Sequence, residues 1–326
     1  MLSLSLFLLN ILFLPESLFS EAFSFDPLKE NKDSTLGFFS RRKLITVPIG
    51  VAGAVVYGKL LSTSFEKLTR GDLVYPNAHE HRVRSTISTA VIGSIPPNLK
   101  IKNDDDGSER LVRSLRILEV GLGKENRVIQ IGLYKDAFSE ATSKGISKIE
   151  LIGVDIVSPT TAILERSKNI LMRTGEDNGA NVSFEFVKGS VTSGLDYEDG
   201  FFDCVISSLT LCAVEDQVTA LNEIKRVLKS DGGTFGYVEH VAVNPDEPYS
   251  LLSLEQKLFN PLQILVADNC HLNRFTEDNI SSVFGISDGS SMTTAAKSTK
   301  LTGERFLVDG MWPISCQACG VFKKLQ

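Results

Sequence analysis

The chain has 326 residues, which is enough for one large domain or two small ones. Apolar residues make up 42% of it and charged residues 23%, as in an ordinary globular protein. A formal net charge of -6 argues against a nucleic-acid-binding surface, and five cysteines argue against a disulfide framework.

An apolar run from Leu2 to Leu14 opens the chain and is short for crossing a bilayer. It matches the hydrophobic region of a secretory signal peptide, and Ser20 to Ala22 supplies small residues at the cleavage-defining positions. Cleavage there leaves Phe23 as the first residue, which resembles the two-part presequences of algae with secondary plastids. We expect a signal peptide and a plastid destination, with the endoplasmic reticulum as the alternative.

A second apolar stretch, 44–58, contains fifteen uncharged residues and follows Arg41 and Arg42. This arrangement is typical of a twin-arginine signal or a short membrane anchor. A buried helix of the folded domain is the alternative, but a run so rich in Gly and Val makes a poor amphipathic helix. We expect residues 1–63 to form a targeting and anchor region that associates with a membrane, and a cleaved second signal is its rival.

Residues 64–110 are polar and mixed, and they predict a helical and linker segment. From 111 to 326, short apolar runs alternate with amphipathic stretches. This alternation predicts an α/β fold: a Rossmann-like, doubly wound, mainly parallel sheet with helices on both faces. The expected strands are 116–120, 149–155, 182–189, 202–208 and 234–240, and the expected helices are 126–144, 159–175 and 217–233.

Only Cys316 and Cys319 form a CxxC pair. Without a second pair, a zinc site has little support. The neighbouring Val321 and Phe322 favour a terminal strand instead, and we expect no metal site.

Candidate ligand-binding residues follow four successive expected strands. In an open parallel sheet, ligands bind beyond the carboxyl ends of the strands. Glycines there let the backbone approach a ligand, and an acid after the second strand can accept both hydroxyls of a ribose. The candidates are Glu119, Gly121 and Gly123 at the first strand, Asp155 and Ile156 at the second, Ser190 and Val191 at the third, and Ser207 and Leu209 at the fourth.

The segment from Leu209 to Val241 carries "LTLC", "EIKRVLKSDGG" and "VEHV". It resembles the class I S-adenosylmethionine-dependent methyltransferases, in particular the thiol methyltransferases and the methyltransferase type 11 group. "DNCHLNR", within 260–280, is similar to the D-G-C-x-L-T-R segment of the thiol-methyltransferase branch. The resemblance covers about two-thirds of the chain. It implies a class I methyltransferase domain at 111–326, S-adenosyl-L-methionine as cofactor and a small-molecule methyl acceptor.

The chain departs from that family at several positions. Glu125 stands where the loop has its third glycine, and Ser190 replaces an acidic residue near the adenine. Asp231 replaces the proline of K-P-G-G, and an insertion lies around 135–148. A non-catalytic binding protein with a weakened cofactor loop is therefore an alternative. A nicotinamide-dependent oxidoreductase is a third interpretation, disfavoured because no dehydrogenase catalytic set is present.

Methyl transfer from a sulfonium is an in-line displacement, so the enzyme mainly aligns the reactants and excludes water. A thiol acceptor has only to lose its proton, whereas a phenol or carbon acceptor needs a better-placed base. The candidate bases are Glu239, His240 and His271, each with a structural role as the alternative. Cys212 and Cys270 are expected to be packing residues. The apolar N-terminus favours a lipophilic acceptor of the thiol or quinone/phenol type.

Overall fold

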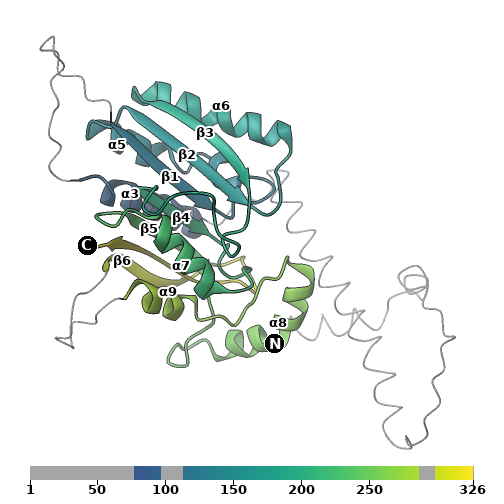
Figure 1. Cartoon of the computed structure of the whole chain (residues 1–326). Coiled ribbons are helices and arrows are strands. Elements are labelled where there is room, and N and C mark those ends of the chain that lie inside the picture. Colours follow the sequence, from purple (N-terminus) through teal and green to yellow (C-terminus); the bar gives the residue numbers. More distant parts are fainter. Residues whose placement is uncertain (1–76, 97–112, 286–297, 326) are drawn as a thin grey trace, which may run out of the picture. The chain divides into compact units, whose positions relative to one another are not determined.

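The computed structural model describes residues 77–96, 113–285 and 298–325 (Figure 1). The expected signal peptide, the anchor at 44–58 and the loop at 103–110 lie outside these residues. Apart from Leu265–Ala267, the described residues belong to one compact unit. Within the described ranges, no helix combines the length and the apolar character needed to cross a membrane.

A seven-stranded sheet forms the centre of this unit, in the order β3-β2-β1-β4-β5-β7-β6. Neighbours among β1 to β5 are parallel, and β7 is antiparallel to both β5 and β6. The mainly parallel sheet and its five expected strands are confirmed, as is the terminal strand, whereas β6 was not predicted. The strands are β1 (Ser114–Val120), β2 (Lys148–Asp155), β3 (Asn181–Lys188), β4 (Cys204–Ser208), β5 (Thr234–His240), β6 (Ser298–Leu307) and β7 (Cys316–Lys324).

Helices connect most of these strands (Figure 1). The single helix expected at 126–144 is two helices, because the chain turns at Gly132, where φ is 72°. The helix expected at 217–233 ends at Val227, since Leu228 is extended and pairs with Phe202. The helices are α3 (Asn77–Gly93), α4 (Arg127–Gln130), α5 (Lys135–Ser143), α6 (Thr161–Asn178), α7 (Gln217–Val227), α8 (Ser250–Val266) and α9 (Thr276–Phe284).

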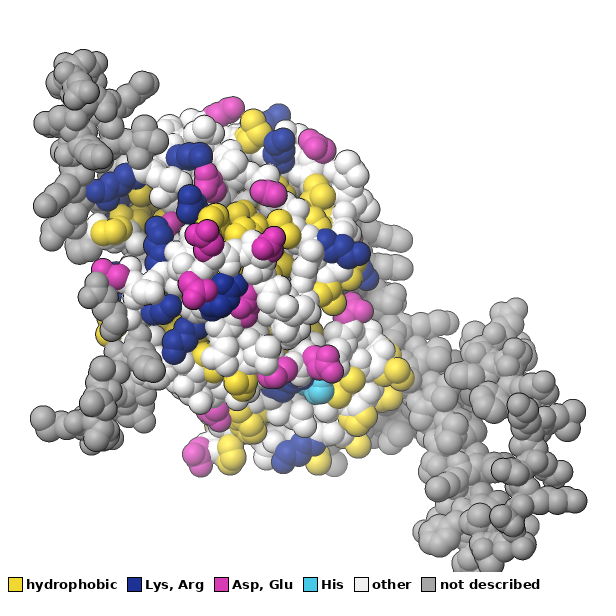
Figure 2. Space-filling model, in the orientation of Figure 1, with side chains coloured by type: hydrophobic (Ala, Val, Ile, Leu, Met, Phe, Trp, Pro, Cys, Tyr) yellow, Lys and Arg dark blue, Asp and Glu magenta, His cyan; other side chains and the backbone are white. Residues whose placement is uncertain are grey.

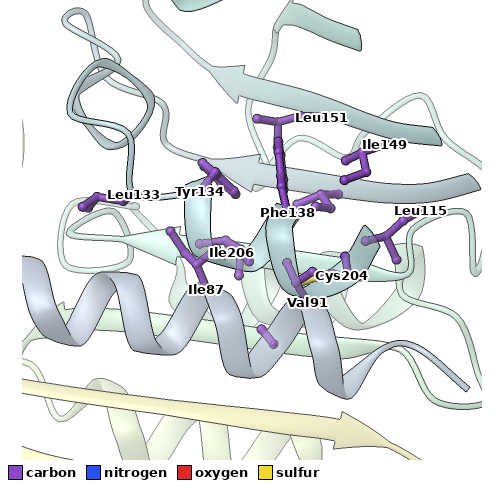
Figure 3. Packing of buried hydrophobic residues seen from close by; sticks show 14 of the residues in the cluster. Ile87, Val91, Leu115, Leu133, Tyr134, Phe138, Ile149, Leu151, Cys204 and Ile206 are labelled. Carbon is purple, nitrogen blue, oxygen red and sulfur yellow. The ribbon is translucent and has the colours of Figure 1, made fainter. Parts of the chain in front are cut away.

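Two hydrophobic cores lie on opposite faces of the sheet. Successive residues of a strand point to opposite faces, so Ile117 enters one core and Leu118 the other. Helices α3, α5 and α6 contribute to the first core, which Figure 3 shows around Phe138, Ile87 and Leu151. Helices α7 and α9 contribute to the second. The expected helical cover on both faces is confirmed.

Helix α3 packs into the first core through four apolar residues of one face. Val83, Ile87, Ala90 and Val91 are each at most 1% exposed. The hydroxyl of Thr234 in β5 also donates a hydrogen bond to the carbonyl of Ala90. The sheet domain therefore includes this helix, which the sequence-based boundary at residue 111 leaves outside.

The described surface carries charges of both signs. On the face that Figure 2 draws, basic and acidic side chains are interspersed rather than gathered by sign. Cys316 and Cys319 of β7 enter opposite cores, so they cannot share a metal ion. The terminal-strand interpretation of the CxxC pair is confirmed by this arrangement.

Candidate active site

Strand register brings the carboxyl ends of β1, β2 and β4 to one edge of the sheet. Val120 pairs with Val154 on one side and with Ser207 on the other. The loop after β1 begins there, and its first amide, of Gly121, donates to the carbonyl of Val154 at 2.8 Å. The first, second and fourth groups of predicted ligand-binding residues therefore flank one another.

Gly121 and Gly123 both adopt left-handed backbone angles, with φ of 75° and 73°. Side chains other than glycine rarely adopt such angles. A Cβ added to Gly121 would lie 1.9 Å from Oγ1 of Thr210, so the loop packs directly on the segment after β4. A Cβ at Gly123 would meet no atom within 4 Å, so the space beside this residue is open.

Asp155 joins the end of β2 to the glycine loop. Its Oδ2 accepts a hydrogen bond from the amide of Gly123, and its Oδ1 accepts one from the amide of Val157, both at 2.8 Å. A carboxylate oxygen can accept more than one hydrogen bond, so ribose hydroxyls can still bind here. Ile156 is 64% exposed and offers an apolar surface beside this carboxylate.

Glu119 is the penultimate residue of β1. It is 2% exposed and accepts a hydrogen bond from the hydroxyl of Tyr134 at 2.8 Å. Burial raises the pKa of Glu119 to about 7, although the bond from Tyr134 opposes the shift. The hydrogen bond therefore ties the end of β1 to the segment before α5. Sequence reasoning missed Tyr134, because it precedes α5 and nothing local marks its partner.

Ser190 and Val191, the two predicted residues after β3, differ from each other in burial. The hydroxyl of Ser190 lies 2.8 Å from that of Thr192 and also accepts from the Thr192 amide. Val191 is 4% exposed and belongs to the second core. The side chain of Val191 therefore packs inward, while Ser190 remains partly exposed at the edge of the sheet.

Glu239 holds the segment that follows β4. It is fully buried, and its carboxylate accepts from the hydroxyl of Ser207 at 2.8 Å and from the amides of Thr210 and Cys212 at 3.0 and 3.4 Å. Burial raises its pKa. Leu209, within this segment, has φ of 52°. These contacts give Glu239 the structural role that the sequence left open for it.

His240 ends β5 and is 1% exposed. Its Nε2 lies 2.9 Å from Sγ of Cys270, and its Nδ1 is buried without a hydrogen-bond partner among the described residues. His271 is only partly buried, and its amide donates to the carbonyl of Cys212. Burial, followed by the nearby charge of Arg274, lowers the pKa of His271.

Glu125, the residue in place of the third glycine, is exposed in the turn before α4. The next residue, Asn126, is buried and donates to the hydroxyl of Ser167 in α6 at 2.7 Å. The close packing between loop and helix is thus supplied by Asn126, and the carboxylate of Glu125 points away from the core.

Part of the chain is similar in sequence to known proteins. Residues 131–235 match the family described as "Methyltransferase domain". The human thiol S-methyltransferases TMT1B and TMT1A are 39% identical over 79 residues and 38% identical over 76 residues. These alignments cover 24% and 23% of this chain and 30% of each relative, so the match spans less than a third of the relatives' length.

Solved structures are similar at lower identity. The YcgJ protein of Bacillus subtilis is 18% identical with a TM-score of 0.44, covering 76% of this chain and 100% of that one. A second similar structure, from Methanosarcina mazei, is described as one of SAM-dependent methyltransferases. It is 16% identical to this chain, with a TM-score of 0.43. Coverage there is 66% of this chain and 95% of the other.

Proposed function

We propose that this chain, which contains a class I S-adenosylmethionine-dependent methyltransferase domain, transfers a methyl group from that cofactor to the thiol of a small, lipophilic molecule. The observation that carries the cofactor assignment is the shared edge of β1, β2 and β4. There, the left-handed Gly121 donates its amide to the carbonyl of Val154, and the left-handed Gly123 donates its amide to the carboxylate of Asp155.

The state of the candidate bases supports a thiol acceptor. Glu239 is fully buried, and its carboxylate accepts hydrogen bonds from the segment after β4. The Nε2 of His240 faces the thiol of Cys270. A thiol has an ordinary pKa of about 8.5, against about 10 for a phenol, so it needs less help to ionise. The similar human proteins are named thiol S-methyltransferases. A quinone- or phenol-type acceptor would need a general base to remove its proton, and the partly exposed His271 is the candidate for that role.

Membrane association and a plastid location belong to the same proposal. Helix α8 exposes leucines at positions 251, 254 and 258, spaced as on one face of a helix and each at least 60% exposed. Such an apolar face suits a membrane surface or a lipophilic acceptor's route of entry. Together with the apolar stretches at 2–14 and 44–58, it supports an enzyme that works at a membrane.

Titration calorimetry with S-adenosylmethionine, followed by turnover with a lipophilic thiol and a matched phenol, tests the proposal. We expect binding and methylation of the thiol. Asp155→Ala should weaken cofactor binding by about 1–3 kcal/mol, the scale for removing a charged hydrogen-bond partner. The exposed Asp246, a residue outside the loop, provides a control in Asp246→Ala.

The outcomes separate the competing interpretations. Folded protein that does not bind the cofactor contradicts the proposal. Binding without turnover of any acceptor favours the non-catalytic alternative that Glu125 and Ser190 suggest. Tight binding of NAD without binding of S-adenosylhomocysteine favours an oxidoreductase.

A further inference from the structure

Two cysteines and one histidine from three separate segments meet at the carboxyl edge of the sheet. Cys212 follows β4, His240 ends β5, and Cys270 lies between α8 and α9. One sulfur or nitrogen atom from each lies within 4.8 Å of those of the other two. The sequence predicted packing roles for both cysteines. Both are indeed buried, but their thiols also face each other and the imidazole.

The distances suit a tetrahedral metal ion. Zn–S bonds of about 2.3 Å and Zn–N bonds of about 2.0–2.1 Å separate two sulfur ligands by about 3.8 Å and a sulfur from a nitrogen by about 3.5 Å. Sγ of Cys212 lies 3.9 Å from Sγ of Cys270. Nε2 of His240 lies 2.9 Å from Sγ of Cys270, so a small rotation of the ring opens the space that an ion needs.

The donor set selects the kind of ion. Two sulfurs and an imidazole prefer Zn²⁺ and other thiophilic cations, whereas Mg²⁺ and Ca²⁺ prefer oxygen. Gln263 donates a hydrogen bond to Sγ of Cys270 at 3.3 Å, a contact that favours a thiolate. The imidazole presents Nε2 to the thiols, and no partner on Nδ1 among the described residues holds the ring in another orientation.

We propose that Cys212, His240 and Cys270 bind one Zn²⁺ ion, and that its fourth position takes the sulfur of the acceptor. The second half of this proposal rests on the proposed function. Three protein ligands with one open position are the arrangement of catalytic rather than structural zinc. Cys212 follows β4 and His240 ends β5, so the ion would lie at the carboxyl edge of the sheet, which we call the cofactor edge because the glycine loop and Asp155 lie there.

The chemistry balances without a further reactant. On binding Zn²⁺, the acceptor thiol releases its proton to solvent, because the cation stabilises the thiolate. A sulfur lone pair then forms the new S–CH₃ bond as the methyl–sulfonium bond breaks. The electron pair of the broken bond stays on the cofactor sulfur, giving S-adenosylhomocysteine and a methyl thioether. In this scheme, the protein needs no general base for the acceptor, in agreement with the buried surroundings of Glu239 and His240.

Titration of the reduced, metal-depleted full chain with Zn²⁺ tests the site. We expect one equivalent to bind, and we expect Co²⁺ to give thiolate-to-cobalt charge-transfer absorption. Cys212→Ser, Cys270→Ser and His240→Ala should each weaken Zn²⁺ binding by more than about 100-fold, since even outer-shell changes cost 10–100-fold. Cys319→Ser is the matched control, a buried cysteine of β7 outside the cluster, and it should bind as the wild type does.

Three results would overturn the metal site: no Zn²⁺ uptake by the wild type, Co²⁺ spectra without thiolate bands, or ligand variants that bind as tightly as Cys319→Ser. A Cys212–Cys270 disulfide in unreduced protein, together with no Zn²⁺ uptake after reduction, would identify a redox pair instead. Circular dichroism of the same variants shows whether they are folded.

Turnover separates the two halves of the inference. Thiol methylation that is lost on metal depletion and restored by Zn²⁺ supports coordination of the acceptor sulfur. Unchanged methylation without metal contradicts that coordination. If Zn²⁺ binds but no thiol is methylated at all, the metal site stands and the thiol acceptor of the proposed function falls.

Discussion

Gly121 and Gly123 have nearly the same backbone angle but different surroundings. An alanine at either position is strained by about 1–2 kcal/mol, because φ is positive. At Gly121 the new Cβ would also overlap Thr210, whose hydroxyl donates to the carbonyl of Val120. Thr210 therefore leaves no room for a side chain at Gly121, whereas Gly123 has room for one.

We expect Gly121→Ala to lower the free energy of unfolding by about 1–3 kcal/mol more than Gly123→Ala, the usual cost of overpacking. Urea denaturation of both variants measures the difference. The second variant is the control for backbone strain alone. Equal losses in the two variants would mean that the loop relaxes away from Thr210.

The buried carboxyl group of Glu119 predicts a pH dependence of stability. Its pKa is 4.5 ordinarily and about 7 in the folded protein, so the folded state binds the proton more tightly. Its contribution to stability is therefore present below pH 4.5 and is lost as the pH rises to about 7. The loss is on the order of 3 kcal/mol, at about 1.36 kcal/mol for each pKa unit.

Glu119→Gln should remove this dependence, because the amide does not titrate and can still accept from Tyr134. Chemical denaturation of wild type and variant at a series of pH values between 5 and 8 provides the measurement. The wild type should lose stability relative to the variant as the pH rises. Parallel curves across this range would show that Glu119 keeps an ordinary pKa.

At the scale of elements, the segment after β4 depends on the end of β5. The carboxylate of Glu239 accepts hydrogen bonds from Ser207 in β4 and from Thr210 and Cys212 in the segment after it. Thr210 also packs under Gly121, so β5 fixes the glycine loop through an intermediate segment. The end of β5 and the glycine loop after β1 are coupled in this way.

In Glu239→Gln, the side-chain NH₂ group would face the hydrogen-bond donors at the end of β4 and in the segment after it, so at least one donor would lose its acceptor. We expect Glu239→Gln to lower the free energy of unfolding by about 1–3 kcal/mol, the cost of leaving a buried donor unpaired, and to weaken binding of S-adenosylmethionine. Denaturation and calorimetry measure the two effects. The control is Glu304→Gln, at a half-exposed residue of β6 that lies outside the proposed cofactor site. Unchanged cofactor affinity would contradict the coupling between β5 and the loop.

At the scale of the whole molecule, the prediction concerns location. We expect tagged protein to fractionate with membranes, most of all those of a plastid, and to resist carbonate washing. The expectation rests on the apolar stretches at 2–14 and 44–58 and on the arginines at 41 and 42, which stay on the side of origin. Deleting 44–58 should release the protein into the wash.

A control variant with serine at positions 251, 254 and 258 of α8 separates the two apolar regions, because these side chains are already exposed and contribute little to folding. If the wild type washes off freely and its N-terminus lies beyond Leu61, the second stretch is a cleaved targeting signal rather than an anchor.

The sequence alone determined the class of the fold and the strand-end positions. Alternating apolar runs and amphipathic stretches are local patterns, so they predicted β1 to β5 with small errors at the ends. Local signals did not predict β6, whose residues are mostly exposed. They also gave one helix where α4 and α5 are separated by a turn at Gly132, since one glycine within a helical pattern does not specify a turn.

Only the tertiary structure decided which side chains meet. Thr210 lies under Gly121, Tyr134 binds Glu119, and Cys212 and Cys270 meet at His240, although each set is spread over many residues of sequence. Periodicity shows which face of an element is buried, but not which residue of a distant element lies opposite. Strand order and register set those contacts, and both follow from packing of the whole sheet.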